Sequence, residues 1–528
     1  GTITSDTTWN GNLAMVDTVV VLNGKTLTIA PGTHILVADS LVVGYRIPLI
    51  VKGKLVADGN ENDTVQFVPA TRSRWGGVRF ESSTGGSRLT YLRLLADTLT
   101  GNTNSDTALV IINNPGITID HLALDSNTYV AIKAVNSNVT LKNSSFYPKF
   151  SSYYMHFKGG KAFVESSNFT LNPSDFIYNG LMHFEDVDSA RIDSCQFTDN
   201  TISNVPELLA ISGSGKIYFT RNRIQKYGEI KVNENFTGTL WMDKNRYFHP
   251  KNILQHNSSR VIMTNNLIYS DSNDTNPFSI ISMDGNYAAQ PLKLLFINNT
   301  WFRKGGTDGY NRISPSGLSA DSLIVKNNIF YGLDNLYYII GGSVIFEYNA
   351  YDPAAGNDNN IGTEGIAFRD TVSENSLDLA LRYTSTGINA SDPELSLSLF
   401  PDTLDLAGKS HRFSDTLDLG AYEFIPLKIT NHPSDVAICE GSNATFGVAT
   451  NFTPGSYLWQ TSADSSNWTN VGSNQDTYAI SNATTTGGDT TITYIRCIVG
   501  ADGFANDTSS TAVLTVYPKL NVGVTISA

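Results

Sequence analysis

The stretch Leu323-Ile-Val-Lys-Asn-Asn-Ile-Phe330 decides the fold, because its residue pattern returns along most of the chain. Apolar residues alternate, a polar pair that often contains Asn follows, and apolar or aromatic residues come next. The clearest copies are 139–146, 216–224, 260–268, 295–301 and 344–349. Alternation of apolar residues is typical of a strand with one buried face, so the pattern predicts a repeating short strand followed by a polar corner.

The polar corners recur at a nearly constant spacing. Aligned along the chain, they are Asn127, Ser144, Ser167, Cys195, Asn222, Asn245, Asn266, Asn299, Asn328 and Asn349. Their mean step is about 25 residues, which lies in the range of solenoid repeats. A single unit of this size cannot bury its apolar face, whereas stacked units share one continuous core. The sequence therefore predicts an all-β solenoid in which residues about 25 positions apart become neighbours.

A second strand pattern precedes the first in several repeats. Residues 129–135 lead through a short corner into the strand at Val139, and residues 155–160 lead into the strand at Ala162. Each turn is therefore expected to hold at least two strands, hydrogen-bonded to neighbouring turns as in a parallel sheet. Asn at the corner tolerates the left-handed backbone region, and stacked Asn side chains can form a hydrogen-bonded ladder. The alternative is that Asn is merely common in turns.

Segments at both ends of the repeat region add a resemblance to known proteins. The opening turns of bacterial surface β-helix proteins are similar to 23–32, 51–59, 65–68 and 75–80, and the terminal segment called choice-of-anchor Q is similar to 387–393, 401–407 and 418–423. Together with the repeat, these segments resemble the right-handed parallel β-helix superfamily, in the form found in surface proteins of the phylum Bacteroidetes. The resemblance implies a right-handed parallel β-helix over residues 1–425.

A different pattern follows the repeats. Cys439, Trp459 and Cys497 stand at spacings that resemble an immunoglobulin-like (Ig-like) β-sandwich, predicted over residues 426–518. The resemblance implies a disulfide between Cys439 and Cys497 that bridges the two sheets over Trp459. Ile495 stands where such domains place a tyrosine. A generic β-domain with two unpaired thiols is the alternative.

The last residues, 519–528, resemble the first strand of a further domain or a linker. Tandem arrays of such domains are typical of large Bacteroidetes adhesins exported by the type IX system. The chain opens directly into polar sequence without a signal peptide, which predicts a processed or partial chain. The resemblance implies secretion to the bacterial cell surface.

Composition limits the classes of partner. The net charge is −13 and the sequence has no basic cluster, which argues against nucleic acid as a partner. No apolar run approaches the roughly 20 residues of a membrane span. Cys195 lies alone far upstream of the other cysteines, and no Cys/His spacing fits a zinc site.

A short modification motif is frequent. Asp followed by Ser or Thr and then by Ala, Ile, Leu, Val, Met or Thr resembles the O-glycosylation sequon of the Bacteroidetes. Its acceptors here are Thr7, Thr18, Ser40, Thr64, Thr98, Thr107, Ser189, Ser322, Thr371, Thr403, Thr416 and Thr490. This enrichment predicts that some of these side chains are glycosylated. The alternative is that Asp-Thr is a favourable junction between turn and strand.

The residue patterns of β-helix glycoside hydrolases and lyases are missing from the sequence. The best catalytic candidates are His156, His183, Glu185, Asp186 and Asp188. The two histidines share a Met-His-Phe context 27 residues apart, so they are expected to stack one turn from each other. Such a cluster suits acid–base chemistry or metal binding. The alternative is a pair of outward histidines beside an acidic corner, since Ala210 ends the column.

Two Asx-rich loops, 271–274 and 357–360, could hold calcium through oxygen atoms. The candidate ligands are Asp271, Asp274 and Asp358. Ordinary exposed turns have the same composition, and the sequence indicates no cofactor other than calcium. Trp9, Trp75, Trp241 and Trp301 could stack on sugars, but most aromatic side chains must fill the core.

These observations favour a secreted surface protein, an adhesin or structural stalk that binds glycans or other extracellular polymers without catalysis. A solenoid offers a long, rigid face that suits extended ligands. The alternative is a polysaccharide lyase or a glycoside hydrolase with an unfamiliar site.

Overall fold

The computed structural model describes residues 1–38, 46–70, 75–95, 107–124, 130–148, 153–171, 180–200, 207–226, 228–250, 252–257, 259–271, 281–284, 292–305, 313–316, 322–333, 336, 343–352, 359–372, 374, 377–411 and 416–519. The chain divides into two compact units, one of Gly1–Glu364 with Asn389–Glu423 and one of Gly365–Ile388 with Phe424 onward. No helix in the described residues is long and apolar enough to cross a membrane.

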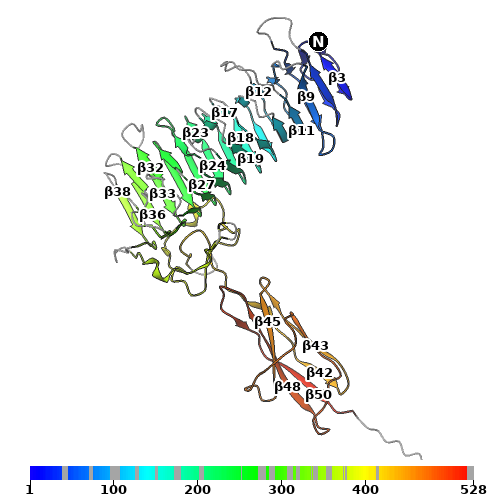
Figure 1. Cartoon of the computed structure of the whole chain (residues 1–528), viewed down its shortest axis with the longest axis vertical. Helices are drawn as coiled ribbons and strands as arrows, with labels where there is room; N and C mark the ends of the chain where they lie inside the picture. Colours follow the sequence, from blue (N-terminus) through cyan, green and yellow to red (C-terminus); the bar gives the residue numbers. More distant parts are fainter. Residues whose placement is uncertain are drawn as a thin grey trace, which may run out of the picture. The chain divides into compact units, whose positions relative to one another are not determined.

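The first unit is a parallel β-helix with three faces, and its coils stack from the N-terminus to β38 (Figure 1). Face 1 consists of β1 (Thr2–Ile3), β4 (Val19–Val21), β7 (Leu49–Val51), β10 (Val78–Glu81), β12 (Thr107–Ile112), β14 (Val130–Val135), β17 (Tyr153–Lys158), β20 (Gly180–Glu185), β23 (Glu207–Ser212), β26 (Ile230–Val232), β29 (Leu254–His256), β32 (Ile281–Asp284) and β35 (Ile313–Ser316).

Face 2 follows face 1 in each coil. It consists of β2 (Thr7–Trp9), β5 (Thr26–Ile29), β8 (Lys54–Asp58), β11 (Ser87–Leu94), β13 (Ile117–Leu124), β15 (Val139–Lys142), β18 (Lys161–Glu165), β21 (Ser189–Asp193), β24 (Lys216–Thr220), β27 (Thr239–Asp243), β30 (Arg260–Thr264), β33 (Lys293–Ile297), β36 (Ser322–Lys326) and β38 (Ser343–Glu347).

Face 3 completes each coil. It consists of β3 (Asn12–Met15), β6 (His34–Val37), β9 (Val65–Pro69), β16 (Ser145–Phe146), β19 (Asn168–Leu171), β22 (Gln196–Asp199), β25 (Arg223–Gln225), β28 (Arg246–Phe248), β31 (Leu267–Asp271), β34 (Thr300–Lys304) and β37 (Ile329–Tyr331). The long strands β11 and β13 belong to both face 2 and face 3, because each pairs with strands of both.

The register of these strands confirms the predicted solenoid. In face 2, Val164 lies opposite Ile192 of the next coil, and Ile192 lies opposite Phe219. Alternate side chains point inward and form columns along the core, such as Phe146 stacked on Phe169, whose ring centroids lie 5.1 Å apart. Three strands per coil, where at least two were expected, therefore enclose one continuous apolar core.

The predicted asparagine ladder follows the corner between faces 2 and 3. Its linked members are Asn222, Asn245, Asn266, Asn299, Asn328, Asn349 and Asn360. Oδ1 of Asn266 accepts from the backbone N–H and from Nδ2 of Asn245, at 2.9 and 3.0 Å. Nδ2 of Asn266 donates to the Met242 carbonyl at 2.8 Å. The ladder thus satisfies polar groups that the corner buries; Asn127 lies outside the described residues.

The left-handed backbone falls on the residue before each ladder position, which corrects the expectation that one Asn serves both purposes. Arg221, Lys244 and Asn265 have φ values of 55°, 58° and 54°. Residues of very different type take this conformation, because the stacked strands on either side determine the turn. The ladder position therefore depends on the amide of Asn for its hydrogen bonds.

Residues Asn389–Glu423, called the covering segment here, lie on the outer side of face 2. Its short 3-10 helix η3 (Leu397–Leu399) belongs to an apolar cluster whose buried members are Ile262, Leu295, Ile297, Phe400 and Leu417. Lys326 Nζ donates to Asp392 at 2.8 Å, and Lys244 donates to Asp402 near the other end of the contact. The segment that resembles choice-of-anchor Q thus shields outward apolar side chains of the downstream coils.

The predicted span 1–425 for the β-helix differs from the structure at one place. Gly365–Ile388, with β39 (Phe368–Asp370) and β40 (Asp378–Leu381), groups with the second unit. Arg382 donates twice to Asp502, at 3.1 and 2.9 Å, and the backbone N–H of Tyr383 donates to Gly503. Only η1 (Thr363–Gly365) lies between these strands and the last described coil, so the chain leaves the β-helix and then returns to it.

The second unit is a two-layered β region. One sheet has the order β42 (Val436–Cys439), β50 (Ala512–Tyr517), β48 (Thr491–Gly500), β45 (Ser456–Ser462) and β46 (Thr469–Val471), with β49 (Asp507–Thr508) beside β48. The facing strands are β43 (Ala444–Gly447) with β47 (Thr477–Ile480), and β41 (Ile429–Asn431) with β44 (Ala449–Thr450). Both layers contribute to one core around Trp459, and all the described pairings are antiparallel except β42 with β50.

The predicted disulfide between Cys439 and Cys497 is wrong. Both cysteines are free thiols, and both lie in the same sheet with β50 between their strands. Cys497 is buried opposite Trp459, whereas Cys439 is exposed at the end of β42 beside Tyr517. Phe446 of the facing layer, Trp459 and Cys497 are all buried members of one core.

Candidate functional site

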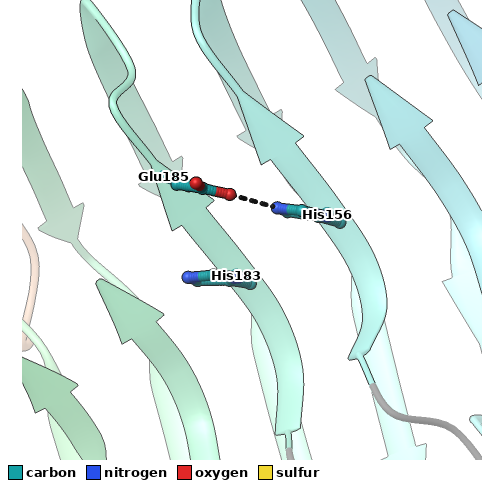
Figure 2. Close-up of side chains that lie close together, drawn as sticks. All are labelled: His156, His183 and Glu185. Carbon is teal, nitrogen blue, oxygen red and sulfur yellow. Dashed lines mark hydrogen bonds and ion pairs between the residues drawn. The ribbon is translucent and has the colours of Figure 1, made fainter. Parts of the chain in front are cut away.

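The predicted histidine pair lies on the outer side of face 1 (Figure 2). His156 of β17 stands directly opposite His183 of β20, and Ala210 follows in register, as expected. The two imidazole rings stack with centroids 4.8 Å apart and an angle of 10° between their planes. The parallel register therefore holds two side chains that are 27 residues apart in a fixed geometry.

Glu185 is the third member of this cluster. Its Oε2 lies 3.2 Å from Nε2 of His156, the contact drawn in Figure 2, and its Oε1 accepts from Lys158 at 2.6 Å. One donor atom from each of His156, His183 and Glu185 lies within 4.8 Å of the others. Three of the five predicted site residues are thus brought together.

The other two predicted residues lie apart from this cluster. Asp186 takes the left-handed corner position after β20, with φ of 51°, and Asp188 is exposed in the turn before β21. Neither carboxylate belongs to the group of donor atoms that His156, His183 and Glu185 form. Of the three acids predicted from the run His183–Asp188, Glu185 is therefore the one in the cluster.

An open groove of about 570 Å³ borders the cluster. Its lining residues are Tyr153, His183, Glu185, Ser212, Lys231, Asn233, Glu234, Asn235 and Asn257. Nε2 of His183 lies 2.9 Å from the Ser212 hydroxyl, and the Tyr153 ring lies 4.7 Å from the imidazole of His183. Polar groups from neighbouring coils thus converge on one side of the imidazole pair.

Burial and neighbouring charge set the protonation of the cluster. Burial, with the nearby His156, lowers the pKa of His183 to about 4. Burial also lowers the pKa of His156, although Glu185 opposes this shift. The hydrogen bond from Lys158 lowers the pKa of Glu185. Near neutral pH the cluster therefore holds two uncharged imidazoles and a carboxylate, groups that suit metal binding or proton transfer.

A second groove, which the sequence reasoning did not find, lies on the outer side of face 2. Phe163, Arg191, Tyr218 and Trp241 follow one another in register on four adjacent strands. The rings of Tyr218 and Trp241 stack with centroids 4.8 Å apart. Beside Pro401 and Asp402 of the covering segment, this row borders a groove of about 350 Å³.

The arginines of this second groove share one carboxylate. Asp193 accepts from Arg221 and, at 3.4 Å, from Arg191. Thr220 Oγ1 donates to the same carboxylate at 2.6 Å. Nε of Arg191 is buried and has no hydrogen-bond partner among the described residues. The groove therefore combines the aromatic side chains of Phe163 and Tyr218 with the guanidinium of Arg191, whose side chain is 41% exposed.

The tryptophans named from the sequence differ in burial and in the direction they face. Trp301 and Trp75 are buried in the β-helix core, and Trp9 is half-buried against it. Trp241 is the outward one, packed partly against the covering segment. Strand alternation could assign each ring to a face only after the register was known, which is why the groove was missed.

The calcium candidates stay a prediction, because the structure describes only one of the three. Asp271 ends β31 opposite Lys304, and Asp274 and Asp358 lie outside the described residues. Asn360, from the second loop, is used by the asparagine ladder, where its Oδ1 accepts from Asn349. No group that includes these aspartates was found within the part of the chain that the structure describes.

The O-glycosylation acceptors stay a prediction. Thr403 and Thr490 are exposed, and the other acceptors within the described residues are partly exposed: Thr7, Thr18, Thr64, Thr107, Ser189, Ser322, Thr371 and Thr416. Ser40 and Thr98 lie outside the described residues. The accessible positions are compatible with modification.

Comparison with known proteins adds one match. Residues 430–518 match a family model described as a domain of unknown function, DUF8696. This match covers most of the second unit and none of the β-helix. No curated protein matches the chain.

Proposed function

We propose that this chain is a secreted bacterial surface protein whose β-helix binds glycans in the groove beside Tyr218. The observation that carries this proposal is the outward row in which Tyr218 lies next in register to Arg191, whose side chain is 41% exposed. The exposed part of the guanidinium can donate hydrogen bonds to ligand oxygens. A sugar ring supplies such oxygens on its edge and an apolar face for the tyrosine.

The row of outward side chains suits a polymer better than a small molecule. Phe163, Arg191 and Tyr218 lie on successive strands, which are spaced about 4.8 Å apart in a sheet. A chain of sugars laid along the β-helix would meet these side chains one after another. Arg191 and Arg221 share Asp193, and Asp243 and Asp402 also line the groove, so neither sign of charge dominates there.

The wider setting is that of an adhesin. This part of the proposal is supported by the resemblance to Bacteroidetes surface proteins with Ig-like domains, by the low content of charged residues, and by the partly exposed glycosylation motifs. It includes export by the type IX system, modification as a glycoprotein, and extracellular polymers as partners. The second unit would then act as a spacer or as one member of a tandem array.

A glycan array tests the proposal with the untagged chain. The wild type is expected to bind a subset of polysaccharides, and Tyr218→Ala to weaken binding by about tenfold, equivalent to about 1.4 kcal/mol. Tyr147→Ala is the matched control, because Tyr147 is 47% exposed and lies outside the lining of the groove. Failure of the wild type to bind any glycan would overturn the proposal.

The groove on face 1 favours a second candidate, a polysaccharide lyase or hydrolase. His183 and Glu185 lie in an open groove with Lys231 and Tyr153, groups that could transfer protons. Incubation with the same polysaccharides discriminates between the candidates. New reducing ends or unsaturated products that vanish in His183→Ala would favour the enzyme, and binding without products would favour the adhesin.

A further inference from the structure

We infer that His156, His183 and Glu185 form a binding site for one divalent transition-metal ion of the zinc class. The inference is independent of the glycan proposal, because it concerns face 1 and none of the side chains that line the groove of face 2. Two imidazoles and one carboxylate are a donor set that zinc and iron sites use, with the remaining positions left to water or a ligand.

The geometry is close to what such an ion requires. The three donor atoms lie within 4.8 Å of one another. Donors at about 2.0–2.1 Å from a tetrahedral zinc ion lie roughly 3.4 Å apart. Side-chain rotations of the half-buried imidazoles and of Glu185 can close this difference, because the groove beside them is open. The backbone register of β17 and β20 need not change.

One neighbour of the cluster competes with a metal ion for Glu185, and another can support the orientation of His183. Lys158 holds Oε1 of Glu185 at 2.6 Å, so the ammonium competes with an ion for the carboxylate while Oε2 stays directed at His156. The Ser212 hydroxyl, 2.9 Å from a ring nitrogen of His183, can fix the orientation of that imidazole, as outer partners do in metal sites. Removal of the competitor should therefore strengthen binding.

Isothermal titration of the untagged, chelator-treated full chain with zinc chloride tests the site. One ion per chain is expected for the wild type. His156→Ala and His183→Ala should each weaken zinc binding by at least about tenfold, and Glu185→Gln by a similar factor. His121→Ala is the matched control, since His121 is also a half-buried, ring-stacked histidine beside an acid, at the corner between faces 2 and 3, and it should leave the affinity unchanged.

The variant Lys158→Met distinguishes a metal site from a cluster whose role is only structural. It should raise zinc affinity several-fold, because Glu185 loses the cation with which it now pairs. Cobalt(II) loaded into the wild type should give visible absorption bands of a nitrogen- and oxygen-liganded site, and these bands should be lost in His183→Ala. Circular dichroism confirms that each variant folds.

Three outcomes would overturn the inference. They are no uptake of zinc by the wild type, full zinc affinity in His156→Ala and His183→Ala, and a loss of affinity in His121→Ala as large as in those two variants. The last result would identify general binding by surface histidines.

Discussion

The corner column of the β-helix is built from Ser144, Ser167 and Cys195 in its upstream coils and from asparagine in its downstream coils. In the upstream part, the backbone N–H of Ser144 donates to the Ser167 hydroxyl at 3.2 Å, and that hydroxyl donates within its own coil. In the downstream part each asparagine makes two bonds to the next member and another to a neighbouring carbonyl. Each upstream member thus makes fewer hydrogen bonds along the column than each downstream asparagine does.

The outer side of face 2 changes at nearly the same place. Downstream, Ile262 and Leu295 point outward and are buried by the covering segment. Upstream, Phe163, Arg191 and Tyr218 occupy the same row and border an open groove. The groove at Tyr218 therefore lies where this outward row meets Pro401 and Asp402 of the covering segment, and the histidine cluster lies on face 1.

The largest expected effect comes from breaking the asparagine ladder in its middle. Asn266→Leu removes the acceptor for two N–H groups of Asn245 and the donor to the Met242 carbonyl, and leaves them buried. We expect the free energy of unfolding to fall by about 3–4 kcal/mol. Urea unfolding followed by circular dichroism measures it, with hydrogen exchange assigning the transition to the β-helix.

Ser144→Ala is the upstream counterpart of that variant. It removes one acceptor, for the Leu122 N–H, and a donor that bonds within its own coil, so about 1 kcal/mol is expected. Equal losses for Ser144→Ala and Asn266→Leu would contradict the difference between the two parts of the column.

A buried histidine makes the downstream coils sensitive to acid. His256 of β29 points into the core between Val232 and Met283, and burial lowers its pKa to about 3. The unfolded chain, with a histidine pKa near 6.5, binds more protons between about pH 6.5 and pH 3. Stability should therefore fall on acidification through this window, by up to about 1.4 kcal/mol per pH unit.

Unfolding free energies measured from pH 7 to pH 4 test this contribution. His256→Leu should flatten the profile, whereas His121→Ala, a change at a half-buried histidine on the upstream coils, should not. A profile that keeps its slope in His256→Leu would show that other groups cause the acid sensitivity.

A smaller effect is expected from loosening the covering segment. Phe400 is 7% exposed and packs in the cluster with Ile262 and Leu417. Phe400→Ala should cost about 2 kcal/mol, less than a substitution deep in a core, because the segment can settle into part of the space. Hydrogen exchange should accelerate over the covering segment and β30, while β18 and β21 exchange as before. Faster exchange in the upstream coils would mean that the segment supports the whole β-helix.

The repeat was predictable because it depends on local chemistry. Alternation and the position of Asn266 and its equivalents were enough to place one coil above the next, and the 27-residue spacing placed His156 beside His183. What failed depends on which elements meet across the fold. Cys439 and Cys497 have sandwich-like spacings, yet their strands share one sheet. The groove at Tyr218 forms beside Pro401 and Asp402, which lie far along the chain, and no local pattern encodes that contact.

The smallest effect is expected at Cys195, where the corner column changes from its upstream part to its asparagine part. Cys195 lies between Ser167 and Asn222, and its thiol donates to the carbonyls of Asp193 and Val164 at 3.4 and 3.6 Å. Cys195→Ser should change stability by no more than about 0.5 kcal/mol, because a hydroxyl already serves at the equivalent Ser167. Burial raises the pKa of this thiol to about 12, so a maleimide should label the exposed Cys439 and spare Cys195 in the folded chain. A loss of several kcal/mol in Cys195→Ser would mean that the upstream corner depends on the size of its side chain, and the two parts of the column would then differ in packing and not in hydrogen bonding.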